Sequence, residues 1–186
     1  MKQDSTNKTG RIEIICGSMF SGKTEELLRR CKRAKIAKQK VGLFKPEIDH
    51  RYDKKALVSH DQRKQEATAI KRSADLLEVS RGYEVLGIDE AQFFDSGLPN
   101  IVNQMANQGK RVILAGLDMD SFGAPFGIMP RLMAIAEEVT KLQAVCVRCN
   151  GKAHFTHRLV ESEDQVQLGA HSEYEPLCRS CYNERA

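Results

Sequence analysis

No apolar run in the sequence approaches the roughly 20 residues that a helix needs to cross a bilayer. The first segment, Met1–Arg11, is polar and lacks the apolar centre of a signal peptide. Internal repeats and low-complexity segments are also missing, so the sequence does not indicate a repeat protein. From these absences we expect a cytoplasmic protein without a membrane partner, which begins with a disordered tail over residues 1–10.

A large net charge is missing too, because the sum over all 186 residues is only +4. So small an excess does not indicate a nucleic-acid partner, although it is compatible with a polyphosphate substrate. The length suits one domain with a small appendage, and the hydrophobic content of 41% is ordinary for a globular protein. In a cytoplasmic chain, the six cysteines favour metal ligands or free thiols over disulfides.

One stretch has the form G-x-x-x-x-G-K-[ST] and lies between an apolar run and a helical pattern. In a phosphate-binding loop, glycines let backbone N–H groups point at phosphate oxygens, and the helix N-terminus favours negative charge. Lys23 would then contact the β- and γ-phosphates, and Thr24 would ligate Mg²⁺. A glycine-rich turn that ends in a helix cap is the alternative interpretation. The residues expected to bind ATP here are Gly17, Ser18, Met19, Phe20, Ser21, Gly22, Lys23 and Thr24.

Two acidic residues follow a second apolar run. Val85–Ile88 has the continuous apolar character of a parallel strand buried on both faces, and Asp89 and Glu90 come directly after it. An acid at the tip of such a strand, downstream of a phosphate loop, is where nucleotide enzymes hold Mg²⁺. We assign that role to Asp89 and expect Glu90, at the mouth of the site, to accept a proton. The alternative is that the two acids cap a helix.

Helical and strand-like patterns alternate along the chain. Helices are expected at Glu25–Gln39, Ser73–Val79, Leu98–Gln108 and Leu132–Glu138, and later strands at Val41–Phe44, Ala67–Ile70, Arg111–Ala115 and Lys141–Val145. This alternation predicts a three-layer α/β domain with a mainly parallel sheet over residues 11–145, with ligands at the carboxyl ends of the strands. The basic face of the first helix is interpreted as solvated, with nucleic-acid binding as the alternative.

Two loops have compositions that suit a binding site. The charged segment 47–64 shows no sustained periodicity, and it is either a loop that reaches the site or a solvated connector. The segment 116–130 is rich in glycine, proline and phenylalanine, and it is too apolar to be only an exposed connector. Phe122 and Phe126 within it would either wall a flat ligand or pack beneath the loop.

The sequence changes character at Cys146. Two C-x-x-C pairs, Cys146 with Cys149 and Cys178 with Cys181, are separated by a loop longer than zinc ribbons usually have. Four thiolates placed in this way form a closed tetrahedral Zn²⁺ site, which is structural and not catalytic. We therefore expect one structural Zn²⁺ in a small zinc-ribbon-like domain over residues 146–186, with the nearby histidines outside the metal shell.

Taken together, these motifs closely resemble those of the type II thymidine kinases, the cytosolic-type, zinc-containing family. The matching segments are Gly-Ser-Met-Phe-Ser-Gly-Lys-Thr at 17–24, Asp-His-Arg-Tyr at 49–52, Ile-Asp-Glu-Ala-Gln-Phe-Phe at 88–94, Leu-Asp at 117–118, Pro-Phe-Gly at 125–127 and both cysteine pairs. The resemblance implies transfer of the γ-phosphoryl group of ATP to the 5′-hydroxyl of thymidine, giving dTMP and ADP. It also implies a homotetramer that is inhibited by dTTP.

The resemblance further implies roles for single residues. Glu90 is implied as the general base, and Arg51 as an assistant to the phosphate. Ala91 and Gln92 join Asp89, Glu90 and the phosphate loop in binding ATP. The residues implied to associate with Mg²⁺ are Thr24, Asp49 and Asp89. The implied thymine pocket consists of Met19, Phe93, Leu117, Phe122, Phe126, Thr156 and Tyr174, of which Tyr174 belongs to a lasso loop that covers the substrate.

The sequence departs from the family pattern in three places. His50 replaces the usual threonine, and Gly169-Ala170 stands where many members have two glycines. Ser-Phe-Gly-Ala at 121–124 replaces the common Phe-Arg-Gly-Glu, which leaves the register of Phe122 open by one residue.

Rival functions account for parts of the sequence. A nucleic-acid-dependent P-loop ATPase with a zinc ribbon would explain Asp-Glu-Ala-Gln at 89–92, which resembles a helicase box. Against it, the chain is short for a helicase and has no basic stripe with interleaved aromatic residues. A zinc-ribbon adaptor without activity leaves the phosphate loop unexplained, whereas a kinase for another deoxynucleoside remains open. We therefore expect ATP and thymidine, and no nucleic acid, as partners.

Overall fold

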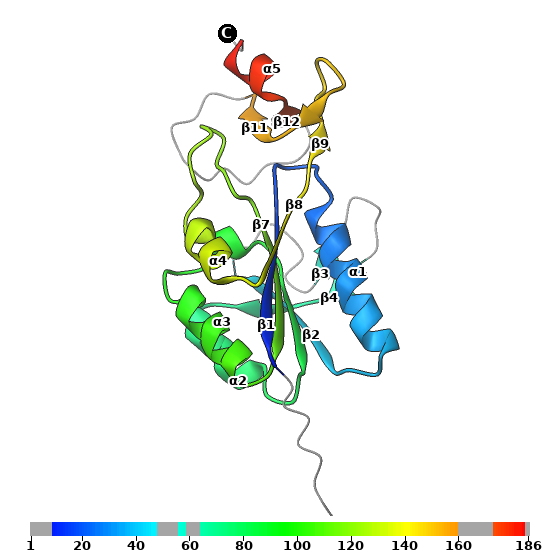
Figure 1. The fold of residues 1–186 in the computed structure, drawn as a ribbon, viewed down its shortest axis with the longest axis vertical. Coiled ribbons are helices and arrows are strands. Elements are labelled where there is room, and N and C mark those ends of the chain that lie inside the picture. Colours follow the sequence, from blue (N-terminus) through cyan, green and yellow to red (C-terminus); the bar gives the residue numbers. More distant parts are fainter. Residues whose placement is uncertain (1–8, 48–55, 59–63, 160–172, 185–186) are drawn as a thin grey trace, which may run out of the picture.

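The computed structural model describes residues 9–47, 56–58, 64–159 and 173–184 (Figure 1). Two expected site residues, Asp49 and Arg51, lie outside these ranges. Residues 1–8 of the expected tail and most of the expected lasso loop, residues 160–172, lie outside them as well. Among the described residues, no helix combines the length and apolarity that crossing a bilayer requires.

A six-stranded parallel sheet forms the centre of the molecule. Its strands are β1 (Arg11–Cys16), β2 (Val41–Pro46), β5 (Thr68–Ile70), β6 (Val85–Ile88), β7 (Arg111–Gly116) and β8 (Glu138–Lys141). They lie in the order β5-β2-β6-β7-β1-β8, and each neighbouring pair is parallel. The expected mainly parallel sheet is therefore confirmed, with β1 between β7 and β8.

Helices cover both faces of the sheet, so the domain has three layers (Figure 1). The helices are α1 (Lys23–Ile36), α2 (Leu76–Val79), α3 (Leu98–Asn107) and α4 (Met129–Ile135), with 3-10 turns η1 (Ser73–Asp75) and η2 (Ala91–Phe93). α1 buries Leu27, Leu28, Cys31 and Ala34 against one face of the sheet, as their helical spacing predicts. α2, α3 and α4 cover the other face, where Ile12, Ile14 and Leu86 lie in a second core.

The two expected elements at the end of the sheet domain differ most from the structure. The helix expected at Leu132–Glu138 spans Met129–Ile135 instead, because Glu138–Lys141 forms the edge strand β8 and pairs with β1. The strand expected at Lys141–Val145 is divided for the same reason. Its last two residues form β9 (Ala144–Val145), which leaves the sheet and pairs with β10 (Lys152–Ala153).

The elements after β8 form a small unit, which we call the cysteine lobe (residues 144–159 and 173–184). Besides β9 and β10 it contains β11 (Phe155–Arg158), β12 (Tyr174–Leu177) and α5 (Arg179–Asn183), with β11 and β12 antiparallel. It has its own core and lies beyond the carboxyl edge of the sheet (Figure 1). A separate antiparallel pair, β3 (Ala56–Val58) and β4 (Lys64–Glu66), lies outside the main sheet.

A buried carboxylate joins the sheet to α1. Glu13 in β1 is only 1% exposed, and it accepts hydrogen bonds from Arg30 (2.8 Å), from Arg111 (2.6 and 3.0 Å) and from Arg11 (2.7 Å). Burial alone would raise the pKa of Glu13, but the hydrogen bonds from these arginines lower it to about 2 from the usual 4.5. The ionised carboxylate is therefore the stable form, and it ties α1 to β1 and β7.

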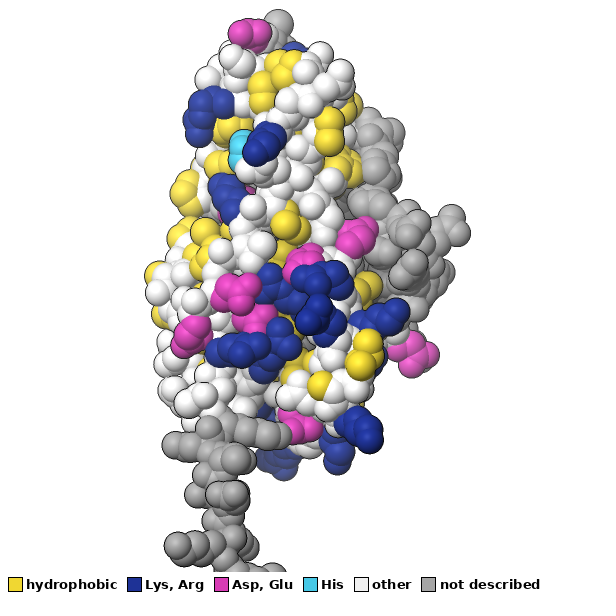
Figure 2. Space-filling model, turned by 45° about the vertical axis from the view of Figure 1, so that its right-hand side comes forward, with side chains coloured by type: hydrophobic (Ala, Val, Ile, Leu, Met, Phe, Trp, Pro, Cys, Tyr) yellow, Lys and Arg dark blue, Asp and Glu magenta, His cyan; other side chains and the backbone are white. Residues whose placement is uncertain are grey.

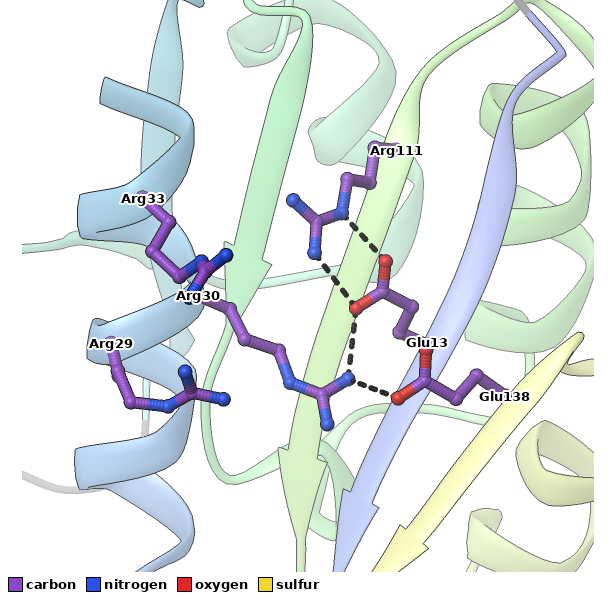
Figure 3. Close-up of a pocket in the computed structure, with 6 residues that line it drawn as sticks. All are labelled: Glu13, Arg29, Arg30, Arg33, Arg111 and Glu138. Atoms are coloured by element: carbon purple, nitrogen blue, oxygen red, sulfur yellow. Dashed lines mark hydrogen bonds and ion pairs between the residues drawn. The ribbon is translucent and has the colours of Figure 1, made fainter. Parts of the chain in front are cut away.

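A hollow of about 340 Å³ opens beside this carboxylate (Figure 3). Its lining consists of Glu13, Arg29, Arg30, Arg33, Arg111 and Glu138. Arg30 also pairs with Glu26 and Glu138, at 2.8 and 2.9 Å, so most of this charge is compensated within the network. The mixture of basic and acidic side chains is visible on the molecular surface (Figure 2). We therefore interpret the side chains that line the hollow as a structural ion-pair network and not as a ligand site.

We predict that Glu13→Gln lowers the free energy of unfolding at pH 7 by about 3–5 kcal/mol, because it leaves buried Arg30 and partly buried Arg111 without their shared anion. Since the folded pKa lies below the unfolded value, the contribution of Glu13 is complete above pH 4.5 and is lost as the pH falls towards 2. Denaturant unfolding of parent and variant from pH 7 to 3 measures both effects. Glu138→Gln, at a half-exposed partner, is the control and should cost less than about 1 kcal/mol. Equal stability of the parent and Glu13→Gln would contradict the prediction.

Candidate active site

Three functional segments leave the sheet at its carboxyl edge. The phosphate loop follows β1, Asp89 follows β6, and Leu117 and Asp118 follow β7. In sheet order these strands are neighbours, β6-β7-β1, so the segments converge at one edge. The segments that are expected to form the ligand crevice therefore lie side by side.

The phosphate loop curls because its glycines adopt conformations that other residues disfavour. Gly17 has φ 142° and Gly22 has φ 83°, and a Cβ at Gly17 would clash with the carbonyl oxygen of Leu142. The Ser21 hydroxyl donates to the carbonyl oxygen of Ser18 at 2.8 Å, which closes the loop on itself. α1 begins at Lys23, so its first N–H groups have no helical partner and can bind an anion.

Lys23 and Thr24 connect the loop to the acidic strand end. The Lys23 ammonium donates to the carbonyl oxygen of Ser18 at 2.7 Å, and the Thr24 hydroxyl donates to the Asp89 carboxylate at 2.9 Å. Desolvation lowers the pKa of Lys23, although the nearby charges of Glu90 and Asp89 oppose that shift. Burial, together with the charge of Glu90, raises the pKa of Asp89 to about 7. Added positive charge, such as a divalent cation, would favour the ionised form of Asp89.

Glu90 is held in a strained conformation next to Asp89. Its backbone is left-handed (φ 51°, ψ 42°), and its N–H donates to the Asp89 carboxylate at 2.9 Å. The buried Gln92 side chain donates to the Glu90 carboxylate at 2.6 Å, and it accepts from the Leu117 N–H at 3.0 Å. Gln92 thereby orients Glu90 and fixes the start of the loop after β7. Ala91, between them, is fully buried.

Apolar side chains of the expected thymine pocket come from the same edge. The rings of Phe93 and Phe126 lie edge to face, with centroids 5.6 Å apart. Met19 donates its backbone N–H to the buried Thr156 hydroxyl at 3.0 Å, so Thr156 in β11 lies directly against the phosphate loop. Four of the seven expected pocket residues thus lie in two contacting pairs, Phe93 with Phe126 and Met19 with Thr156. Leu117 is connected to the first pair through Gln92, which precedes Phe93 and accepts the Leu117 N–H.

Phe122 and Tyr174 share a contact with Arg158. Phe122 is 58% exposed, and its ring lies 5.9 Å from the guanidinium carbon of Arg158. The same guanidinium lies 5.7 Å from the ring of buried Tyr174. Arg158 thus links Phe122 to Tyr174 through cation–π contacts, a connection that the sequence pattern did not reveal.

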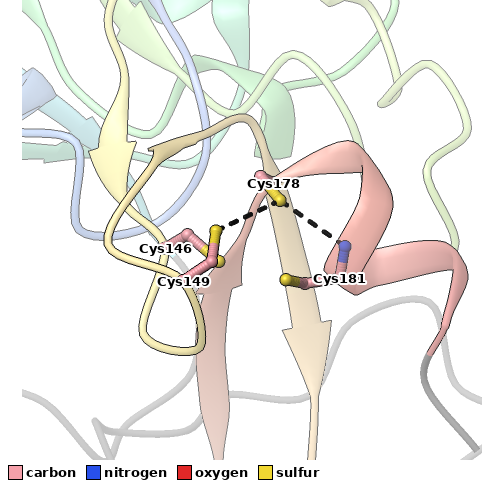
Figure 4. A group of neighbouring side chains, drawn as sticks. All are labelled: Cys146, Cys149, Cys178 and Cys181. Atoms are coloured by element: carbon pink, nitrogen blue, oxygen red, sulfur yellow. Dashed lines mark hydrogen bonds between the residues drawn. The ribbon is translucent and has the colours of Figure 1, made fainter.

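The four paired cysteines form one cluster in the cysteine lobe (Figure 4). The sulfur atoms of Cys146, Cys149, Cys178 and Cys181 all lie within 4.8 Å of one another, which suits ligands of a single metal ion. Burial alone would raise the pKa of Cys146, but backbone hydrogen bonds from residues such as Cys178 and Cys149 lower it to about 6. A thiolate is therefore accessible here near neutral pH, as metal binding requires.

The two remaining cysteines behave differently. Burial raises the pKa of both Cys16 and Cys31 to about 11, so each stays a neutral thiol within the domain core. The four paired cysteines are therefore clustered, as their spacing predicts, and the other two are buried free thiols.

Two contacts at this edge were not found from the sequence. Lys141, at the end of β8, pairs with the buried Asp118 at 2.6 Å. The Tyr182 hydroxyl donates to the carbonyl oxygen of Ser121 at 2.7 Å. The only sequence signals were that Asp118 follows a strand, like Asp89, and that Tyr182 directly follows a paired cysteine.

Comparison with known proteins adds an independent finding. The family model described as thymidine kinase matches residues 10–182. A thymidine kinase of Bacteroides fragilis is 59% identical over 177 residues, which cover 95% of this chain and 89% of that protein. Thymidine kinases of Porphyromonas gingivalis (56% identical, covering 95% of this chain and 87% of theirs) and of Rhodothermus sp. (51%, covering 93% and 81%) are also similar. Since the model and these relatives extend over nearly the whole chain, the protein belongs to the thymidine kinase family.

Proposed function

We propose that this protein is an ATP-dependent thymidine kinase, which transfers the γ-phosphoryl group of ATP to the 5′-hydroxyl of thymidine and yields dTMP and ADP. The observation that carries the proposal is the meeting of the phosphate loop with Asp89 and Glu90 at one sheet edge, in a chain of the thymidine kinase family. A coupled assay of ADP formation over a panel of nucleosides tests it. ADP formation that requires thymidine supports the proposal, and a response to DNA in place of thymidine would overturn it.

The phosphate loop, residues 17–24, is the proposed site of the ATP phosphates. Its N–H groups and the start of α1 favour the negative charge, and Lys23 adds a cation. In the structure the Lys23 ammonium binds the Ser18 carbonyl, so we expect it to exchange that acceptor for phosphate oxygens. Ala91 and Gln92 would support this side of the site from η2.

Oxygen ligands for Mg²⁺ are available beside the loop. The Thr24 hydroxyl and the Asp89 carboxylate lie 2.9 Å apart, and hard oxygen donors of this kind fit Mg²⁺. When bound with ATP, the ion would neutralise charge on the transferred phosphoryl group. Asp49 and Arg51, outside the described residues, stay predicted as assistants to the metal and the phosphate.

Glu90 is the proposed general base. Its carboxylate is held by Gln92 and its backbone by Asp89, so its position is set before substrate arrives. It would take the proton of the 5′-hydroxyl as that oxygen attacks the γ-phosphorus. Phosphoryl transfer needs positioning and charge neutralisation more than covalent help, which is what this arrangement supplies.

Recognition of the base is assigned to an apolar slot at the same edge. Its proposed members are Met19, Phe93, Leu117, Phe122, Phe126, Thr156 and Tyr174. A flat apolar slot admits the pyrimidine methyl group, while buried backbone polar groups reject bases that leave them unpaired. The edge-to-face pair Phe93–Phe126 supports this assignment, whereas the exposure of Phe122 makes it the weakest member.

One structural Zn²⁺ is the proposed occupant of the cysteine cluster, because four sulfur ligands make a closed tetrahedral shell. We further infer an ATP-binding domain over residues 11–145 and a zinc domain with a substrate-covering loop over 146–186, although β9 places residues 144–145 with the latter. Assembly as a homotetramer, inhibition by dTTP and action in the cytoplasm are proposed from the resemblance to the family.

We predict that Glu90→Gln folds and binds both substrates but loses about 10²–10⁴-fold in kcat, because only the base is removed. Isothermal calorimetry with ATP and with thymidine, followed by the coupled ADP assay, separates binding from turnover. Glu78→Gln, on α2 at the opposite edge of the sheet, is the control and should keep parental kcat. A Glu90→Gln rate within threefold of the parent would refute the role of Glu90.

Lys23→Ala should weaken ATP binding by at least tenfold while thymidine binding stays within about twofold, since the lost cation faces the phosphates. Calorimetry with each ligand alone measures the two affinities. Lys32→Ala removes a lysine from the exposed face of the same helix and should leave both unchanged. Equal weakening of both ligands by Lys23→Ala would contradict the assignment.

Removal of the metal should unfold the cysteine lobe and leave the sheet domain folded, because structural zinc sites contribute on the order of 10 kcal/mol to folding. Metal analysis is expected to give one Zn²⁺ per chain in the parent and less in Cys149→Ser. Cys31→Ala, which alters a buried cysteine outside the cluster, should retain full zinc content. Parental zinc content in Cys149→Ser would exclude Cys149 as a ligand.

A further inference from the structure

The cysteine lobe contacts both walls of the proposed substrate site. On one wall, the Thr156 hydroxyl accepts the Met19 N–H of the phosphate loop. On the other, the Tyr182 hydroxyl donates to Ser121 in the β7–α4 loop, residues 117–128. The core of the lobe is also completed from outside, because Phe20 and Met119, one from each wall, pack against it. The lobe therefore holds two loops that belong to the sheet domain.

Tyr182 is fixed more firmly than a surface hydroxyl would be. Its side chain is 4% exposed, and its ring stacks on Phe155 with centroids 4.5 Å apart and an interplanar angle of 21°. It lies in α5, directly after Cys181 of the metal cluster. Gly123, at φ 78°, brings the β7–α4 loop so close that a Cβ there would contact both Phe155 and the Tyr182 hydroxyl. The hydroxyl is thus placed by the end of the lobe that carries the cysteine cluster.

The β7–α4 loop can transmit a displacement of Ser121 because it is cross-linked internally. The Asp120 N–H donates to the Ala124 carbonyl oxygen at 2.9 Å, and the Ala124 N–H donates to the Asp120 carboxylate at 3.0 Å. The Phe126 N–H donates to the Asp118 carbonyl at 3.0 Å, and Met119 forms an isolated bridge with Pro125. A loop tied in this way moves as a unit, so the position of its tip sets the position of Phe126 at its base.

We propose that Tyr182 is a positioning residue for nucleoside binding, which couples the metal-held cysteine lobe to the loop that carries Leu117 and Phe126. The proposal rests on the proposed function, since it takes those side chains as part of the nucleoside pocket. It gives the metal a further role: besides holding the lobe together, it sets the shape of the pocket through one hydroxyl group. Because the Tyr182 hydroxyl donates to the β7–α4 loop, we expect its removal to affect nucleoside binding more than ATP binding.

Tyr182→Phe tests the proposal, since it removes only the hydroxyl and keeps the stacked ring. We expect the thymidine KM to rise roughly three- to tenfold, as for the loss of one neutral hydrogen bond, while the ATP KM stays within twofold. Zinc content should remain that of the parent. Hydrogen–deuterium exchange of residues 117–128 in the zinc-loaded proteins should be faster in the variant, whereas exchange in α3 should not change.

Tyr83→Phe is the matched control, because it removes the hydroxyl of a partly exposed tyrosine next to β6. It should alter neither the thymidine KM nor the hydrogen–deuterium exchange of residues 117–128. If zinc-loaded Tyr182→Phe keeps the parental thymidine KM, the proposal is overturned. Loss of zinc, or an equal rise of the thymidine KM and the ATP KM, would also overturn it, because either result would mark Tyr182 as a merely structural residue. If the parent itself forms no ADP with thymidine, the proposed function fails. In that case the hydrogen–deuterium exchange of residues 117–128 alone tests whether Tyr182 couples the lobe to the loop. Equal exchange in the parent and in Tyr182→Phe would overturn the coupling.

Discussion

Six parallel strands can hydrogen-bond side by side only if all their carboxyl ends reach the same edge of the sheet, and each functional segment of the sheet domain begins at that edge. The phosphate loop follows β1 and Asp89 follows β6, with the end of β7 between them. The hydrogen bond from Thr24 to Asp89 spans this interval. The ion pairs of Glu13 tie α1 to β1 and β7, and so support the helix that presents the phosphate loop.

Within the site, polar groups that await a ligand bind one another. The Lys23 ammonium binds a carbonyl of its own loop, and the Met19 N–H binds the Thr156 hydroxyl. Both contacts follow from the cost of leaving a partly buried donor without an acceptor. Such contacts keep the loop in one shape, so the proposed binding of ATP would need less ordering of the loop.

The cysteine lobe has only a small core of its own, and two further features support it. Four clustered sulfur atoms provide a metal site, and Phe20 and Met119 of the sheet domain complete its apolar core. The second feature connects the lobe to the candidate site, because Phe20 and Met119 belong to the two loops that are proposed to flank the substrate. The proposed coupling between the cysteine cluster and substrate binding depends on these shared residues.

The sequence was sufficient for features whose cause is local. The glycine spacing of the phosphate loop, the continuous apolar run before Asp89 and the helical spacing of Leu27, Leu28 and Cys31 each reflect the backbone conformation of their own segment. The C-x-x-C pairs indicated the cluster because a metal site constrains spacing. The segment from Leu132 to Val145 was predicted less well, since pairing with β1 and β10 decides where its helix ends and its strands begin.

The family and the residues of the candidate site were thus predicted from the sequence itself, through motifs that short stretches of backbone impose. Only the tertiary structure decided which side chains meet. It joined Gln92 to both Glu90 and Leu117, turned Phe122 towards Arg158, and placed the Tyr182 hydroxyl on Ser121. The physical reason is that these partners lie on different elements, so their contacts depend on how the sheet, the loops and the cysteine lobe pack together.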